Sequence, residues 1–203
     1  HYARYRAAIE RGDVQDAEGA ATAALDASRQ RDGDGGHTAT LAYNLALVRI
    51  DDGRPGEAIE PATLALRIAE AGSASGLDPL LARLAFGQAQ LAISPEQGAS
   101  SLANALSDAA QRTDLDDRAF RAAAALGTWA LEREQYEVAR VAWAQAVAHV
   151  RGQAPADILA RERARTAQAV AMIAEHAANE RAAARDQARS EERRVGKECI
   201  EPC

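Results

Sequence analysis

Residues 42–66 read AYNLALVRIDDGRPGEAIEPATLAL, and this stretch decides the fold. Apolar residues recur in it at intervals of three and four, which is the period of an amphipathic helix. The pattern is interrupted once, at Gly53-Arg54-Pro55, where Gly and Pro mark a turn. Small residues such as Ala46 and Ala58 flank this turn and allow two helix backbones to approach closely. The stretch therefore predicts a helical hairpin.

The same pattern occurs four times along the chain, each time as a polar or Gly-containing turn followed by an Ala-rich second helix. Equivalent positions Ala17, Ala58, Gly98 and Ala139 lie 41, 40 and 41 residues apart. A steady period of this length is the signature of a repeat architecture. We expect repeats over about residues 1–31, 38–72, 78–112 and 116–151, followed by a long terminal helix over residues 156–188. This helix is either the first helix of a fifth repeat or a cap that covers the last one.

Composition favours an all-α chain, because good helix formers such as Ala, Leu, Arg and Glu dominate and aromatic residues amount to only 4%. The formal net charge is −6. Clustered Lys and Arg with interleaved aromatic residues are not visible, so we expect no nucleic-acid partner. Apolar runs stay well below the roughly 20 residues that span a bilayer, so we expect no membrane insertion of these residues.

The last residues do not fit the rest of the sequence. Residues 189–199 read RSEERRVGKEC, which resembles the translation of a sequencing adapter. They include the chain's only lysine, Lys197, and Cys199 is one of its two cysteines, the other being Cys203. We expect residues 189–203 to be an artefactual, disordered tail. Because the sequence opens in repeat phase without an initiating Met, we also expect it to be a fragment of a larger protein.

Two copies carry a family resemblance, namely residues 42–66 and residues 126–147, which read LGTWALEREQYEVARVAWAQAV. They resemble the tetratricopeptide repeat (TPR) family, and the resemblance extends over residues 2–150. It implies a right-handed αα superhelix, or α-solenoid, built from stacked hairpins. The period exceeds the family's 34 residues by about seven, so we expect longer hairpins. Departures are Arg49 in place of an aromatic residue, the absence of the turn Gly from the third and fourth copies, and Pro61 inside a second helix.

The resemblance also implies where a partner would bind, because TPR proteins typically use the concave face lined by the first helix of each repeat. Such proteins act as protein-interaction scaffolds for an extended peptide or a helix, here one with acidic character. An alternative is a sensory or spacer region of a larger bacterial envelope protein, resembling TonB-type energy transducers, or of a regulatory protein. The implied partner-binding residues are Tyr2, Arg6, Ile9, Tyr43, Leu47, Ile50, Arg83, Gln90, Arg121, Thr128 and Leu131.

We expect neither catalysis nor a cofactor or metal, because no constellation of reactive side chains has the required spacing. The four histidines, His1, His37, His149 and His176, lie on different predicted elements, and none has another histidine at the i, i+4 spacing of a zinc site. Asp32-Gly33-Asp34 resembles the start of a calcium loop, but Tyr43 stands where the loop requires a bidentate Glu. Residues 72–76 read GSASG and place Ala74 where a nucleophile elbow needs its Ser. Cytoplasm and periplasm of a bacterium both remain open as compartments.

Overall fold

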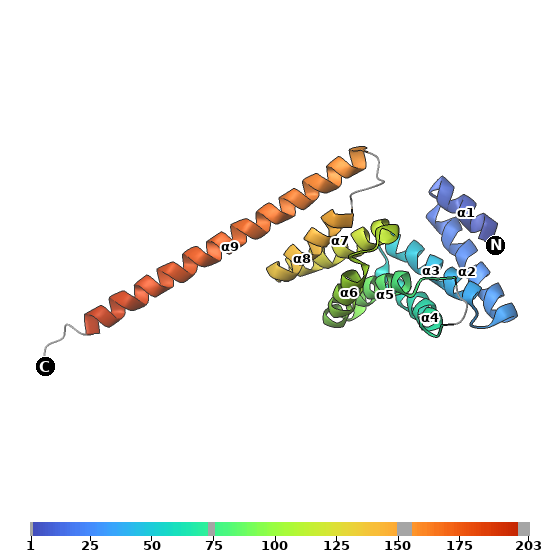
Figure 1. Cartoon of the computed structure of the whole chain (residues 1–203), viewed down its shortest axis with the longest axis horizontal. Coiled ribbons are helices and arrows are strands. Elements are labelled where there is room, and N and C mark those ends of the chain that lie inside the picture. The colour runs from blue at the N-terminus through green and yellow to red at the C-terminus, as the bar shows by residue number, and fades with distance from the viewer. Residues whose placement is uncertain (1, 73–75, 150–155, 199–203) are drawn as a thin grey trace. The chain divides into compact units, whose positions relative to one another are not determined.

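The structure is a computed structural model that describes residues 2–72, 76–149 and 156–198. Within these ranges it contains nine α-helices and two short 3-10 helices, and no strand (Figure 1). The all-α fold class predicted from composition is thus confirmed. None of the described helices combines the length and the hydropathy needed to cross a membrane. The chain divides into two compact units, His1–Gln153 and Ala154–Cys203.

Eight of the helices form the first unit, and consecutive helices pair as four hairpins. Each hairpin corresponds closely to one of the four predicted repeat ranges. A short 3-10 helix, η1 (Pro55–Ala58), precedes the second helix of the second pair, and another, η2 (Thr113–Leu115), precedes the fourth pair. The pairs are α1 (Tyr2–Arg11) with α2 (Val14–Asp32), α3 (Gly36–Asp51) with α4 (Ile59–Glu70), α5 (Pro79–Ile93) with α6 (Pro95–Ala109), and α7 (Asp116–Glu132) with α8 (Tyr136–His149).

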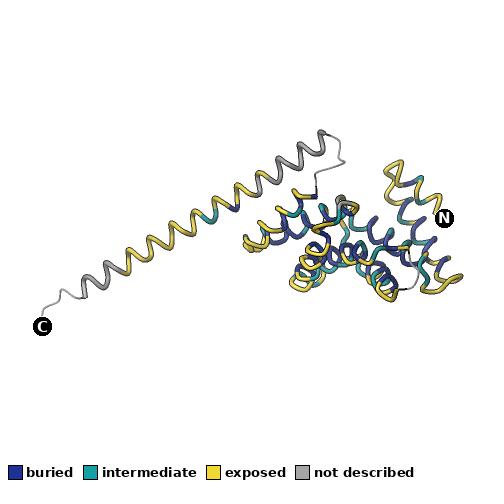
Figure 2. The backbone as a smooth tube through the Cα atoms, in the orientation of Figure 1, coloured by how far each residue is buried: buried dark blue, intermediate teal, exposed yellow. Residues whose placement is uncertain are grey.

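In the first unit, helices that are consecutive in the chain pack against one another. Besides the contact within each hairpin, α2 packs on α3, α4 on α5 and α6 on α7. The first helices also contact one another, α3 with α5 and α5 with α7. The buried residues follow this order and line the inner faces of successive helices (Figure 2). One apolar cluster contains residues of α2, α3, α4 and α5.

Small residues stand where helices of one hairpin cross, as the sequence predicts. A Cβ atom added to Gly87 of α5 would lie 2.8 Å from Cδ1 of Leu102 in α6. One added to Gly127 of α7 would lie 2.6 Å from the Trp143 indole nitrogen. At Gly98 the added atom would overlap the backbone of Leu91. A larger side chain at these positions would therefore push the paired helices apart.

The fourth hairpin forms the same kind of turn as the first two hairpins, although it has no glycine there. Gly12 and Gly53 have φ angles of 70° and 77°, and both amides donate to a carbonyl in the last turn of the preceding helix. In the fourth hairpin Glu134 takes this left-handed conformation, with φ 59°. Its amide donates in the same way, to the Leu131 carbonyl at 3.1 Å. The fourth turn thus keeps the left-handed geometry, although Glu134 suits that geometry less well than a glycine does.

Pro61 is compatible with its helix for a local reason. The α-helical part of the second hairpin's second helix begins only at Ile59, so Pro61 lies in the first turn. Amides of the first turn have no acceptor within the helix, and the N–H that proline lacks is therefore not missed. The sequence predicts Pro61 inside the second helix, but in the structure this residue lies at the start of α4.

The second unit contains one long helix, α9 (Ala156–Glu198), of 43 residues. It continues beyond residue 188, so residues 189–198 are helical and the prediction of disorder over them is wrong. These residues are mainly Ser, Glu, Arg and Lys, most of which favour helix and extend the helix that precedes them. Residues 199–203 of the predicted tail lie outside the described residues.

Candidate functional site

The predicted partner-binding residues of the first helices do not all lie on an open surface. Tyr2 and Ile9 of α1 are exposed, at 43% and 50%, and Arg6 is exposed beside them. Tyr43 and Leu47 of α3 are buried, at 8% and 7%. They belong to the cluster that also contains residues of α5, and Ile50 packs against this cluster. The prediction that Tyr43 and Leu47 line an open groove is therefore wrong.

The remaining predicted residues of α5 and α7 are also partly engaged within the unit. Arg83 pairs with Glu70 of α4 at 2.8 Å and with Asp108 of α6 at 3.5 Å. Gln90 accepts a hydrogen bond from the Ser101 hydroxyl at 2.8 Å. In α7, the exposed Thr128 donates to the carbonyl of Ala124, and Leu131 is partly buried.

Arg121, by contrast, belongs to a charged cluster that joins two hairpins. Its Nη1 atom lies 3.3 Å from Oδ1 of Asp51, which is the last residue of α3. Arg118, one turn earlier in α7, has Nη1 3.5 Å from both oxygens of the same carboxylate. Asp117 completes the cluster, 3.3 Å from Nε of Arg121. Residues 67 and 70 positions apart in the chain are thus held together.

These charges oppose the dipoles of their own helices. A carboxylate at the C-terminus of α3 and guanidinium groups in the first turns of α7 are each placed unfavourably with respect to the local helix dipole. Their mutual attraction offsets part of this cost. The side chain of Arg118 is 25% exposed and that of Arg121 is 48% exposed, so both retain access to solvent.

Tyr5 and Tyr43 lie near enough to the charged cluster for its charges to act on them, and Tyr2 is the neighbour of Tyr5. Tyr2 and Tyr5 of α1 stack with ring centroids 5.9 Å apart. Burial raises the pKa of Tyr5, and the charges of Arg118 and Asp51 also act on it. Burial likewise raises the pKa of Tyr43 to about 12, with Arg118, Asp51 and Asp117 acting on it as well. We call Tyr2, Tyr5, Asp51, Asp117, Arg118 and Arg121 together the tyrosine–arginine face; Tyr43 lies buried beneath it.

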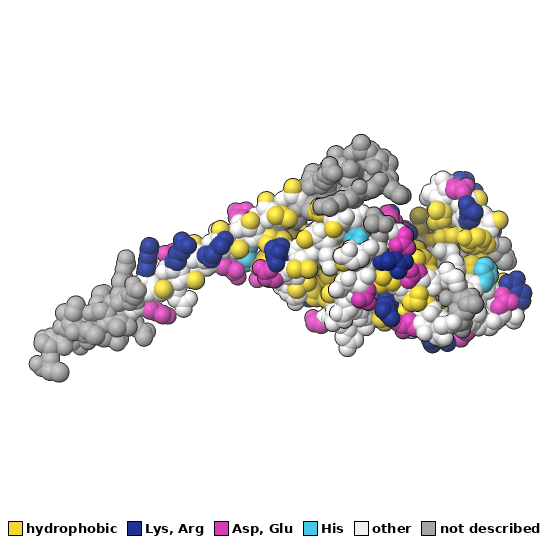
Figure 3. All heavy atoms as spheres, viewed as in Figure 1, with side chains coloured by type: hydrophobic (Ala, Val, Ile, Leu, Met, Phe, Trp, Pro, Cys, Tyr) yellow, Lys and Arg dark blue, Asp and Glu magenta, His cyan; other side chains and the backbone are white. Residues whose placement is uncertain are grey.

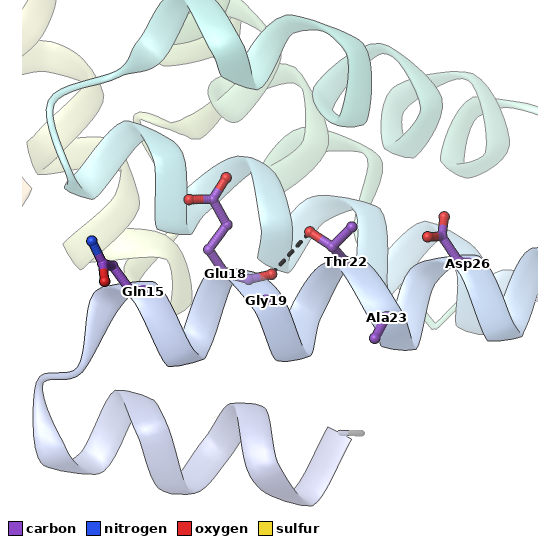
Figure 4. Close-up of a pocket in the computed structure, with 6 residues that line it drawn as sticks. All are labelled: Gln15, Glu18, Gly19, Thr22, Ala23 and Asp26. Carbon is purple, nitrogen blue, oxygen red and sulfur yellow. Dashed lines mark hydrogen bonds between the residues drawn. The ribbon is translucent and has the colours of Figure 1, made fainter.

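A second feature is an open hollow of about 480 Å³ along α2 (Figure 4). All of its lining residues come from that one helix: Gln15, Glu18, Gly19, Thr22, Ala23 and Asp26. Glu18 is held by Arg49 at 2.9 Å and by Arg54 at 2.6 Å, and these two arginines lower its pKa, Arg54 most. The Glu18 carboxylate in this hollow thus already has two arginine partners.

Sequence reasoning missed Tyr5, Asp51, Asp117 and Arg118, and no local signal marks them. On the face shown in Figure 3, basic and acidic side chains alternate over the described part of the first unit, without a broad patch of one sign. Among the side chains that the structure describes, no group of three or more His, Cys, Asp or Glu is arranged to hold a metal ion. No protein-family model matches the chain, and no curated protein is detectably similar to it.

Proposed function

We propose that the first unit is a TPR-like helical-repeat scaffold that binds a segment of another protein against the tyrosine–arginine face. The observation that carries the proposal is the ion-pair cluster that joins α3 to α7, together with Tyr5 of α1, which packs against the apolar cluster that contains Tyr43 of α3. Four hairpins of nearly constant period, with small residues at the helix crossings, support the assignment to a stacked repeat array.

The chemistry of the face suits a partner segment that carries both apolar and acidic side chains. Tyr and Arg are the residues most enriched at energetically dominant contacts between proteins, because each combines a large contact area with a polar group. Tyr2, at 43% exposure, provides the apolar surface. Arg121 provides a planar donor for a carboxylate, and its 3.3 Å contact with Asp51 is longer than an optimal charged hydrogen bond.

A peptide-display selection on the full chain tests this function. Peptides that are enriched should bind in a fluorescence-anisotropy titration, and the double variant Tyr2→Ala/Arg121→Ala should weaken them by about tenfold or more. The control is Arg31→Ala, which removes an exposed arginine of α2 that pairs only with its neighbour Asp32 among the described ion pairs. Equal binding by the wild type and the double variant, or a selection that enriches no peptide, would contradict the proposal.

A further inference from the structure

Asp51 of α3 supplies a carboxylate of the chain itself to the two arginines of the tyrosine–arginine face. Nη1 of Arg118 lies 3.5 Å from both of its oxygens, and Nη1 of Arg121 lies 3.3 Å from one of them. The side chains of Asp51, Arg118 and Arg121 are 38%, 25% and 48% exposed. An acidic side chain of another molecule can therefore reach the same guanidinium groups.

The ion pairs of Asp51 are longer than the pairs that hold another carboxylate of the first unit, that of Glu18. Arg49 and Arg54 approach Glu18 to 2.9 and 2.6 Å. Charge-assisted hydrogen bonds between nitrogen and oxygen are strongest at about 2.7–2.9 Å, so the contacts of Asp51 are the weaker ones. Asp51 is carried by the end of α3 and meets the guanidinium groups at these longer distances. A carboxylate on a flexible segment is free to approach them more closely.

The helix dipoles favour a carboxylate from outside over Asp51. Asp51 is the last residue of α3, where a negative charge is unfavourable. Arg118 and Arg121 lie in the first two turns of α7, near the helix end that attracts an anion. A carboxylate of another molecule gains the attraction of α7 and of both guanidinium groups without the repulsion at the end of α3. The released Asp51 carboxylate is then solvated.

The balance of charges in the cluster favours replacement of Asp51 over addition of a third carboxylate. Two guanidinium groups already face two carboxylates, because Asp117 lies 3.3 Å from Nε of Arg121 and 3.9 Å from Nε of Arg118. A third carboxylate would be repelled by these two and would leave the cluster with a net negative charge. Exchange of one carboxylate for another keeps the cluster neutral. Asp117 belongs to the same helix as the arginines, so Asp51 is the carboxylate that leaves.

We infer that Asp51 is an internal competitor for the arginine pair, and that an acidic side chain of the partner displaces it when the partner binds. The inference rests on the proposed function, because it concerns regulation of the same face. Asp51 lowers the affinity of the chain for an acidic partner. Its displacement also breaks the ion pairs between α3 and α7, so binding releases a link between the second and fourth hairpins.

An NMR titration of the full chain with N-acetylglutamate amide, at constant ionic strength, tests the displacement. The Nε–Hε signals of Arg118 and Arg121 should shift more than those of the other arginines. The side-chain carboxyl ¹³C signal of Asp51 should move toward its position in the double variant Arg118→Gln/Arg121→Gln. The neutral N-acetylglutamine amide should cause neither change. Arginine shifts without a change at Asp51 would overturn the inference, because the probe would then bind beside Asp51, and so would the absence of selective arginine shifts.

The variant Asp51→Asn keeps the size of the side chain and removes its charge. It should bind the probe about fivefold more tightly than the wild type, because two exposed ion pairs of ordinary strength no longer compete. The matched control is Asp108→Asn, which removes the same charge from an arginine pair of the same length, Arg83 with Asp108 at 3.5 Å. This control should bind the probe like the wild type. Equal affinity of Asp51→Asn and the wild type would contradict the competition.

The probe carries no peptide sequence, so its binding is separate from the outcome of the peptide selection. Selective binding of the probe that tightens in Asp51→Asn, together with a selection that enriches no peptide, would support the displacement and contradict the proposed function. Enriched peptides that bind the wild type and Asp51→Asn equally would contradict the displacement and leave the proposed function intact.

Discussion

Glu134 occupies the left-handed backbone position that Gly12 and Gly53 occupy in the first two hairpins. A residue with a Cβ atom loses about 1 kcal/mol or somewhat more in adopting that conformation, because the Cβ approaches the following carbonyl oxygen. The same turn therefore costs more conformational free energy in the fourth hairpin than in the first two hairpins.

Glu134→Gly should for this reason stabilise the chain by about 1 kcal/mol, measured as the free energy of unfolding in urea. The matched control is Gly53→Ala, which introduces the same strain into the second hairpin and should destabilise by a similar amount. A Glu134→Gly variant that is less stable than the wild type would show that the Glu134 side chain contributes more than the strain costs.

The raised pKa of Tyr43 predicts that the free energy of unfolding falls at alkaline pH. Because burial raises its pKa to about 12, above the ordinary value of 10, the folded state holds the phenol proton more tightly than the unfolded state. Its contribution is complete below pH 10 and is lost as the pH rises from 10 to 12. Tyr43→Phe should therefore lose about 2 kcal/mol less than the wild type over that interval.

Helices α3 and α7 are joined by an ion pair in which each charge is unfavourable for the dipole of its own helix. Asp51 lies at the C-terminus of α3 and Arg118 in the first turn of α7. The two belong to the second and fourth hairpins, so their ion pair spans the hairpin between them. It limits how far these two helices can move relative to one another.

A double-mutant cycle with Asp51→Ala and Arg118→Ala should measure a coupling energy of about 0.5 to 1 kcal/mol at low salt. The value should fall with added salt, because both side chains have access to solvent and their attraction is screened. The parallel cycle of Asp51→Ala with Arg31→Ala should be additive. A coupling of zero at low salt would mean that the ion pair does not hold the two hairpins together.

The helices themselves were largely predictable, because local signals mark them. Gly12 and Gly53 end first helices, Pro79 and Pro95 begin α5 and α6, and apolar spacing identifies the buried sides. Local signals are insufficient at the end of α9. The abrupt change of composition there predicts disorder, although most of the residues favour helix. They also could not show that Pro61 lies in a first turn rather than in a helix interior.

The candidate site was less predictable, because it depends on contacts between distant parts of the chain. Tyr43 and Leu47 were assigned to an open face by their position in the first helix. They are buried because α3 and α5 lie against each other along that side. Asp51 and Arg118 were overlooked because only the packing of three hairpins brings residues 67 positions apart within 3.5 Å.

For the whole first unit, we propose that the hairpins stack in file, so that each depends chiefly on its neighbours. In such an array a local defect should propagate to adjacent hairpins and fade beyond them. A molecule with one central core would instead lose protection everywhere at once. Gly98 offers a suitable defect, because a Cβ added there overlaps the backbone of Leu91 and cannot be accommodated by a side-chain rotation.

The most direct measurement is hydrogen exchange of Gly98→Ala compared with the wild type and with Gly19→Ala, where an added Cβ meets nothing within 4 Å. The substitution should cost roughly 1 to 3 kcal/mol. We predict faster exchange in α5 and α6 and in their neighbours α4 and α7, with α1 and α2 remaining protected. Uniform loss of protection over all eight helices of the first unit would contradict the account.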